Sequence, residues 1–194
     1  MILFSRRDLA SARLFALLFA VVVPASPAGA ATFAVSKTAD TNDGVYNADC
    51  SLREAITAAN AAAGGDTITF GVAGLFTITG SALPQITGSL VVNGTSAPGW
   101  VSAPVVRIDG TGLAAGNGLS FAAGASSSSV SALAVTGFPA NGIEILGATT
   151  VITRSYVGVA LDGTTDAGNG QSGIRVAGAN VSARSPSLFQ CNHI

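Results

Sequence analysis

The sequence predicts an all-β solenoid, a right-handed parallel β-helix that begins with one short capping α-helix. Three observations favour this fold. A single amphipathic helix is predicted between Ser51 and the Gly64-Gly65 pair, just before a series of short apolar strands. A phrase of Asn or Ser, then Gly, then a three-residue apolar strand recurs at 117–121, 141–145 and 172–176, which is a solenoid period. Charged residues are only 10% of the chain, and the apolar residues come in short alternating bursts.

Residues 1–30 are predicted to be a secretory signal peptide. An arginine-containing start precedes ten apolar residues, Leu14–Val23, which as a helix span only about half of a bilayer core. Small residues at Ala28 and Ala30 form the pattern that a signal peptidase accepts, so we expect cleavage after Ala30. No later stretch is apolar for long enough to cross a membrane. The mature protein is therefore expected to be secreted or located at the cell surface.

The composition of the mature chain limits its partners. Residues 1–30 hold three of the nine basic and one of the ten acidic residues, so the remainder has a net charge near −3. No run of basic residues is present, and a nucleic-acid partner is not expected. The remaining length suits one domain.

The N-terminal cap is predicted over residues 31–65. Ser51 and Glu54 form a capping box, in which each side chain bonds the other residue's backbone amide. Arg53 is expected to be a surface charge, and Glu54 to act as part of the cap rather than in catalysis. One helical face carries the apolar residues Leu52, Ala55, Ile56 and Ala59. A cap is needed because the first strand of a parallel stack leaves an unpaired edge.

The residues of this cap resemble a known family. Thr38–Gly44, Cys50–Ile56, Ala59-Asn60 and Gly65–Phe70 are similar to the CSLREA domain, and the resemblance covers residues 32–70. That family marks the N-terminus of exported bacterial proteins with right-handed parallel β-helices, so the resemblance implies the same fold and the same export. The family usually has a second cysteine four positions before the motif cysteine, where this chain has Tyr46. The resemblance therefore implies the loss of a local disulfide and a looser loop over 40–49.

The β-helix coils are predicted over residues 66–182. Each phrase is followed by a second strand, so that one coil holds at least two strands, and Leu119, Ile143 and Ile174 are expected to stack. A β-sandwich is the alternative fold, but it needs hairpins and antiparallel strands. Residues 183–194 carry no repeat and are predicted to be an irregular, truncated tail. The last coil would then expose an uncapped edge through which the protein associates with itself.

Cysteine usage gives a further expectation. Cys50 and Cys191 could form one long-range disulfide in an exported protein. We favour two free thiols, because Cys191 lies in the predicted tail.

Two aspartates are the candidate catalytic residues. Asp109 and Asp162 each begin an Asp-Gly-Thr sequence, and they would lie roughly 9.6 Å apart if two coils separate them. This distance exceeds that of a retaining glycosidase pair and only reaches the upper limit for an inverting pair. Asp-Gly sequences are also common in turns, and we favour the turn.

The loop at residues 40–49 is the only candidate metal site. Asp40, Asp43 and Asp49 could bind Ca²⁺ weakly, but their spacing matches neither the EF-hand nor the calcium-binding nonapeptide repeat. His193 is the only histidine, which excludes a histidine-based triad or zinc site. No cofactor is predicted.

The sequence therefore favours an exported protein without catalysis, acting as a structural or adhesive element, with a surface polysaccharide as a candidate ligand. The alternative function is a polysaccharide lyase or hydrolase of the pectate-lyase-like β-helix type, or a fragment of one. A third hypothesis is that the chain is the N-terminal part of a larger repeat protein.

Overall fold

The computed structural model describes residues 29–147, 149–177, 181–184 and 188–189, with backbone only for the last two ranges. The predicted signal peptide falls almost entirely outside these residues. One α-helix, one short 3-10 helix and fourteen strands make up the described chain. The elements are β1 (Thr32–Val35), α1 (Leu52–Ala61), β2 (Asp66–Phe70), β3 (Gly74–Thr77), β4 (Leu90–Asn93), η1 (Gly94–Ser96), β5 (Val106–Asp109), β6 (Leu119–Phe121), β7 (Ser128–Ser131), β8 (Leu133–Thr136), β9 (Ile143–Ile145), β10 (Thr150–Thr153), β11 (Tyr156–Val157), β12 (Ile174–Val176), β13 (Val181–Arg184) and β14 (Leu188–Phe189).

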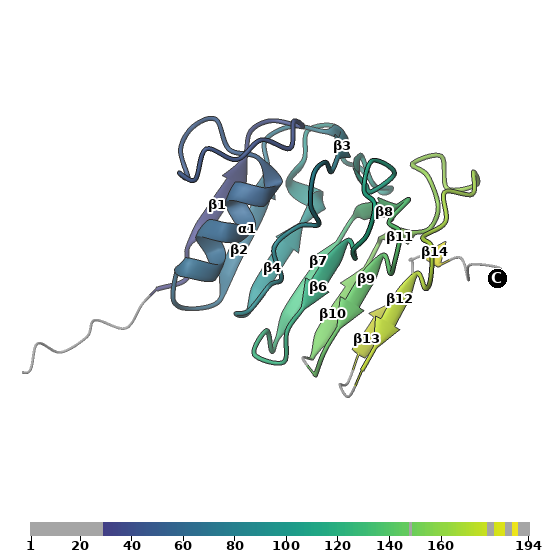
Figure 1. Cartoon of the computed structure of the whole chain (residues 1–194). Helices are drawn as coiled ribbons and strands as arrows, with labels where there is room; N and C mark the ends of the chain where they lie inside the picture. The colour runs from purple at the N-terminus through teal and green to yellow at the C-terminus, as the bar shows by residue number, and fades with distance from the viewer. Residues whose placement is uncertain (1–28, 148, 178–180, 185–187, 190–194) are drawn as a thin grey trace, which may run out of the picture.

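The strands form three separate parallel sheets and no closed barrel. Six strands make the largest sheet in the order β1-β2-β4-β7-β10-β13, five make the second in the order β14-β11-β8-β5-β3, and three make the third in the order β12-β9-β6. β1 and β2 pair within one sheet, and from β2 onward successive strands pass from one sheet to another, so that each sheet gains its strands in sequence order (Figure 1). The chain is thus all-β in character, with one helix.

The strand register confirms that equivalent residues of the recurring phrase lie side by side. Leu119 is the partner of Ile143, and Ile143 is the partner of Ile174. Every pair of named strands in the described chain is parallel, whereas the β-sandwich alternative requires antiparallel neighbours. The sandwich prediction is therefore wrong for this chain.

The core consists of rows of apolar side chains that run from strand to strand. In the largest sheet one row joins Phe33, Ile68, Val92, Val130 and Ile152, and all five are buried. Because side chains alternate between the two faces of a strand, the residues on either side of each row point away from this core.

The glycine of the recurring phrase is needed because two backbones approach closely there. A Cβ atom built on Gly118 would lie 2.3 Å from the Gly142 carbonyl oxygen, and one on Gly142 would lie 2.8 Å from that of Gly173. The residue before the glycine bonds to the next occurrence of the phrase: Asn117 Oδ1 accepts both the backbone and the side-chain N–H of Asn141, at 2.9 Å each. These bonds explain why the phrase begins with a short polar residue.

The α-helix closes the N-terminal end of the largest sheet. Its N-cap, Ser51, and Glu54 form the predicted capping box, and α1 lies against β1 and β2 (Figure 1). The predicted apolar face is buried, with Leu52, Ala55, Ile56 and Ala59 all among the core residues.

Two expectations differ from the structure. Arg53 is not a surface charge: it is 8% exposed, because its guanidinium bonds to distant carbonyls rather than to water. The predicted tail is not wholly irregular, because β13 continues to Arg184 and β14 (Leu188–Phe189) pairs with β11. Leu188 and Phe189 favour a strand although the recurring phrase is absent there. The sheets therefore extend further along the chain than the phrase predicts. The rest of 183–194 lies outside the described residues.

Candidate functional site

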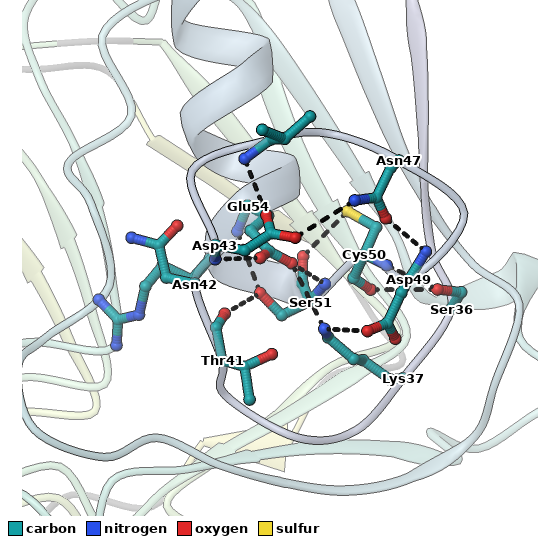
Figure 2. A network of polar contacts seen from close by, with 12 residues as sticks. Ser36, Lys37, Thr41, Asn42, Asp43, Asn47, Asp49, Cys50, Ser51 and Glu54 are labelled. Atoms are coloured by element: carbon teal, nitrogen blue, oxygen red, sulfur yellow. Dashed lines mark hydrogen bonds and ion pairs between the residues drawn. The ribbon is translucent and has the colours of Figure 1, made fainter.

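The densest polar network of the cap surrounds the segment between β1 and α1, here called the cap loop (residues 36–50). Figure 2 shows that its side chains converge on the first turn of α1, where Glu54 and Ser51 lie. Several turns inside the loop are closed by side chains, since Asn42 Oδ1 accepts the Gly44 amide and Asp43 Oδ1 accepts the Val45 amide. The loop is therefore ordered by its own asparagine and aspartate residues as well as by the helix.

Glu54 is the anchor of the cap loop. Its side chain is 1% exposed, and its two oxygens accept the backbone amides of Asp43 at 2.8 Å and Ser51 at 2.7 Å. The ammonium of Lys37 lies 3.8 Å away and also forms an ion pair with Asp49 at 3.0 Å. Burial by itself raises the pKa of Glu54, but the amide bonds and Lys37 outweigh it and hold the pKa below its ordinary value. Glu54 is thus a buried carboxylate that holds the loop to the helix.

Arg53 of α1 links the cap loop to residues 79–82, the segment that follows β3. Its guanidinium makes a two-bond ion pair with Asp40, at 3.0 Å from Nε and 2.7 Å from Nη2. The same group donates to the carbonyls of Ser81 and Ala82, at 2.7 Å each. The Asp40 side chain is 2% exposed and also accepts the Thr79 amide. One buried ion pair therefore joins the cap loop, the helix and the segment at 79–82.

Tyr46 ties the cap loop to β1. Its hydroxyl oxygen accepts the Ala34 amide at 2.9 Å, and its ring packs edge-on against Phe33 with centroids 5.0 Å apart. Ser36 adds a second attachment, because its amide donates to the Cys50 carbonyl at 2.9 Å. These contacts hold the cap loop to β1 at Tyr46, the position at which the resemblance implies the loss of a local disulfide. The expected looseness of 40–49 is not what the described contacts indicate.

The three candidate calcium ligands of the cap loop are engaged separately. Asp40 pairs with Arg53, Asp49 pairs with Lys37, and Asp43 accepts the Val45 amide and the Asn47 side chain. Among the described residues, no three His, Cys, Asp or Glu side chains are grouped as metal ligands would be. Each carboxylate has a structural partner instead.

Cys50 is a free, buried thiol whose Sγ lies 3.3 Å from the Ser51 carbonyl oxygen. Burial raises the pKa of this thiol to about 11, so it is a weak nucleophile at neutral pH. Cys191 lies outside the described residues.

A small depression of about 150 Å³ lies between the cap loop and the outer side of α1. Its lining includes Val45, Tyr46, Ala58 and Ala61, and Val45 is 58% exposed. The lining is mainly apolar, and its one charged residue, Glu54, has its oxygens turned to backbone amides.

The two candidate catalytic aspartates lie in different surroundings. Asp109 ends β5, is 5% exposed, and bonds to Arg107, Thr111 and Thr136. Thr136 of β8 is its register partner, so the next coil offers no carboxylate opposite Asp109.

Asp162 lies in an exposed turn rather than in a strand. Its carboxylate accepts the hydroxyl of Thr165 and the amides of Thr164 and Thr165, and these bonds lower its pKa to about 2. This is the geometry of an aspartate turn. Asp109 and Asp162 do not occupy equivalent positions of successive coils.

A row of charged and polar side chains runs across the third sheet. Glu144 accepts bonds from Arg175 at 2.8 Å, Asn117 at 2.9 Å and Ser120 at 3.1 Å. Ser120, Glu144 and Arg175 are register partners in three adjacent strands. The shared position of these residues in the recurring phrase is the sequence signal that predicts their alignment.

No protein-family model, curated protein or solved structure matches this chain. Within the described ranges, no helix has the length and apolar character needed to cross a bilayer.

Proposed function

We propose that this chain is an exported, non-catalytic structural or adhesive protein built as a right-handed parallel β-helix with a CSLREA-type cap. The observation that supports it best is that Asp109, Asp162 and Glu144 each have hydrogen-bond or ion-pair partners within the protein. Asp109 bonds to Arg107 and two threonines, Glu144 bonds to Arg175, and Asp162 closes its own turn. Charged side chains that are bonded to other groups of the same protein in this way are typical of a structural role rather than of an active site.

The parallel register of the three sheets supports the β-helix part of the proposal, because from β4 to β12 the chain passes through the three sheets in a fixed order, one strand at a time. The cap supports the family resemblance, since the Ser51–Glu54 box and the Arg53–Asp40 pair use the residues of the CSLREA-like motif. Export rests on the sequence of residues 1–30 alone. N-terminal sequencing of the secreted protein tests this last part, with Ala31 as the expected first residue.

Adhesion to a polysaccharide is the proposed role. The test is co-sedimentation of the mature protein with insoluble polysaccharides, together with an assay for turnover of a panel of acidic polysaccharides. We expect retention on at least one polysaccharide without release of shorter sugars. Turnover that Asp109→Ala abolishes would overturn the non-catalytic proposal.

The alternative is a polysaccharide lyase or hydrolase, or a remnant of one. Asp109 favours it, because this carboxylate lies beside the guanidinium of Arg107 at 3.3 Å. An enzyme of this kind would lose activity in both Asp109→Asn and Arg107→Met. Asp162→Asn, which alters an exposed turn, serves as the matched control and should leave that activity unchanged.

A further inference from the structure

The largest sheet has an open face on the side away from the core. Along β1, β2, β4, β7 and β10, buried residues alternate with half-buried or exposed ones, so one set of side chains fills the core and the other points outward. The outward residues form two rows of register partners: Thr32, Thr67, Val91, Ser129 and Val151 in one, and Ala34, Thr69, Asn93, Ser131 and Thr153 in the other. These two rows are here called the outer face.

The chemistry of the outer face differs from that of the other two sheets. Its side chains are threonine, serine, valine, alanine and asparagine, so it offers hydroxyl and methyl groups without a charge or an aromatic ring. The second sheet carries the ion pair of Arg107 and Asp109, and Ala134 beside Arg107 is buried. The third sheet carries the ion pair of Glu144 and Arg175. The outer face is therefore the surface of this stack that is both open and uncharged.

Several hydroxyls of the outer face are available to a surface outside the protein. Within the part of the chain that the structure describes, no protein group hydrogen-bonds to the side-chain hydroxyls of Thr67, Thr69 and Ser129. The inward hydroxyl of Ser128 differs, since it donates to the Ala125 carbonyl at 2.7 Å. A free hydroxyl both donates and accepts, as a water molecule does. These groups can therefore bond to ordered water without breaking a bond inside the protein.

The two rows define a repeat in two dimensions. Neighbouring strands of a sheet lie about 4.8 Å apart, and alternate residues of one strand lie about 6.6 Å apart. The register does not shift from β1 to β10, so this repeat recurs across the sheet, whose strands lie side by side in Figure 1. Oxygen atoms on the prism face of hexagonal ice also repeat along two perpendicular directions, at distances of similar size. The outer face thus presents hydroxyl and methyl groups at spacings close to those of an ice surface.

We propose that the outer face is an ice-binding surface, on which the hydroxyls bond to oxygen positions of the crystal and the methyl groups fill the spaces between them. An ice surface carries no net charge, so the uncharged outer face complements it. An acidic polysaccharide or an anionic membrane would need cations, which the outer face does not supply. A neutral polysaccharide fits less well, because sugar rings pack on aromatic side chains and the outer face has none. Ice binding goes beyond the proposed adhesion to a polysaccharide and does not depend on it.

Partition into slowly grown ice tests the proposal. We expect the mature wild-type protein to be enriched in the ice fraction and to inhibit the recrystallisation of ice in a frozen sucrose solution. Ser129→Tyr and Thr67→Tyr each place a ring on the outer face, and each should abolish both effects because the face then no longer contacts a crystal plane. Ser172→Tyr, at an exposed position just before β12 in the third sheet, is the matched control and should keep both effects.

The unfolding temperature of each variant shows whether it is folded. If a tyrosine variant is unfolded, Thr67→Val supplies the comparison, because it keeps the branched shape and removes one hydroxyl; it should reduce partition into ice. A wild type that stays in the liquid, or folded variants of the outer face that partition into ice as the wild type does, would overturn the proposal. Co-sedimentation with insoluble polysaccharides should be the same in Ser129→Tyr as in the wild type. Retention on a polysaccharide that Ser129→Tyr abolishes would also overturn it, because the outer face would then bind sugar.

Discussion

At the scale of single residues, the cap depends on buried charged side chains that sequence patterns predict to be exposed. Arg53 sits in the helical motif next to Glu54, and nothing local predicts its burial. Its partners are 13 residues before it, at Asp40, and 28 and 29 residues after it, at Ser81 and Ala82. The capping box was predictable because both of its members lie within one helical turn.

Removing Arg53 should destabilise the protein strongly. Arg53→Met leaves the Asp40 carboxylate, 2% exposed, without its cation, and breaking a buried pair in this way costs about 3–5 kcal/mol. The measurement is the urea midpoint, with Arg154→Met as the control because Arg154 is exposed. We expect the control to change stability by less than about 0.5 kcal/mol. Equal effects of the two substitutions would contradict the role of Arg53.

The glycine of the recurring phrase should tolerate no side chain. A Cβ atom on Gly142 meets Asn169 Nδ2 at 2.6 Å and the Gly173 carbonyl oxygen at 2.8 Å, whereas one on Gly88 meets nothing within 4 Å. Gly142→Ala should therefore lower the free energy of unfolding by about 1–3 kcal/mol, and Gly88→Ala should not lower it. Thermal unfolding of the two variants makes the comparison, and an unaffected Gly142→Ala would contradict the close approach of the coils.

At the scale of elements, the helix and the cap loop stabilise each other. The helix supplies Glu54. The loop supplies the Asp43 amide, which bonds to Glu54, and the Tyr46 hydroxyl oxygen, which accepts the Ala34 amide of β1. The existence and apolar face of α1 followed from the sequence, since helical periodicity is local. The loop's attachment to β1 did not, because Tyr46 and Ala34 are 12 residues apart and neither belongs to a periodic pattern.

The cap should also make stability depend on pH. The pKa of Glu54 in the folded state lies below its ordinary value of 4.5, so its stabilisation is complete above that value and is lost as the pH falls through the folded-state pKa. Glu54→Gln should cost about 2 kcal/mol at pH 7 because two amides lose a charged acceptor. The same substitution should cost much less at pH 2. Denaturant unfolding at both pH values measures this difference, and a cost independent of pH would contradict it.

At the scale of the whole molecule, the recurring phrase predicted which strands of the third sheet are neighbours, because each occurrence of the phrase supplies one strand and the strands pair in sequence order. It did not predict β14, which pairs with β11 without the phrase. Asp162 lies in a turn of the segment between β11 and β12, as its Asp-Gly sequence favours, whereas Asp109 ends β5.

The central claim is that successive coils of one chain lie side by side in parallel register. Nuclear Overhauser contacts between backbone protons of Leu119, Ile143 and Ile174 test it most directly. The account predicts short inter-strand contacts between Leu119 and Ile143 and between Ile143 and Ile174, in the pattern of parallel strands. Antiparallel Hα–Hα contacts between consecutive strands of the chain, with none joining Leu119 to Ile143, would contradict it.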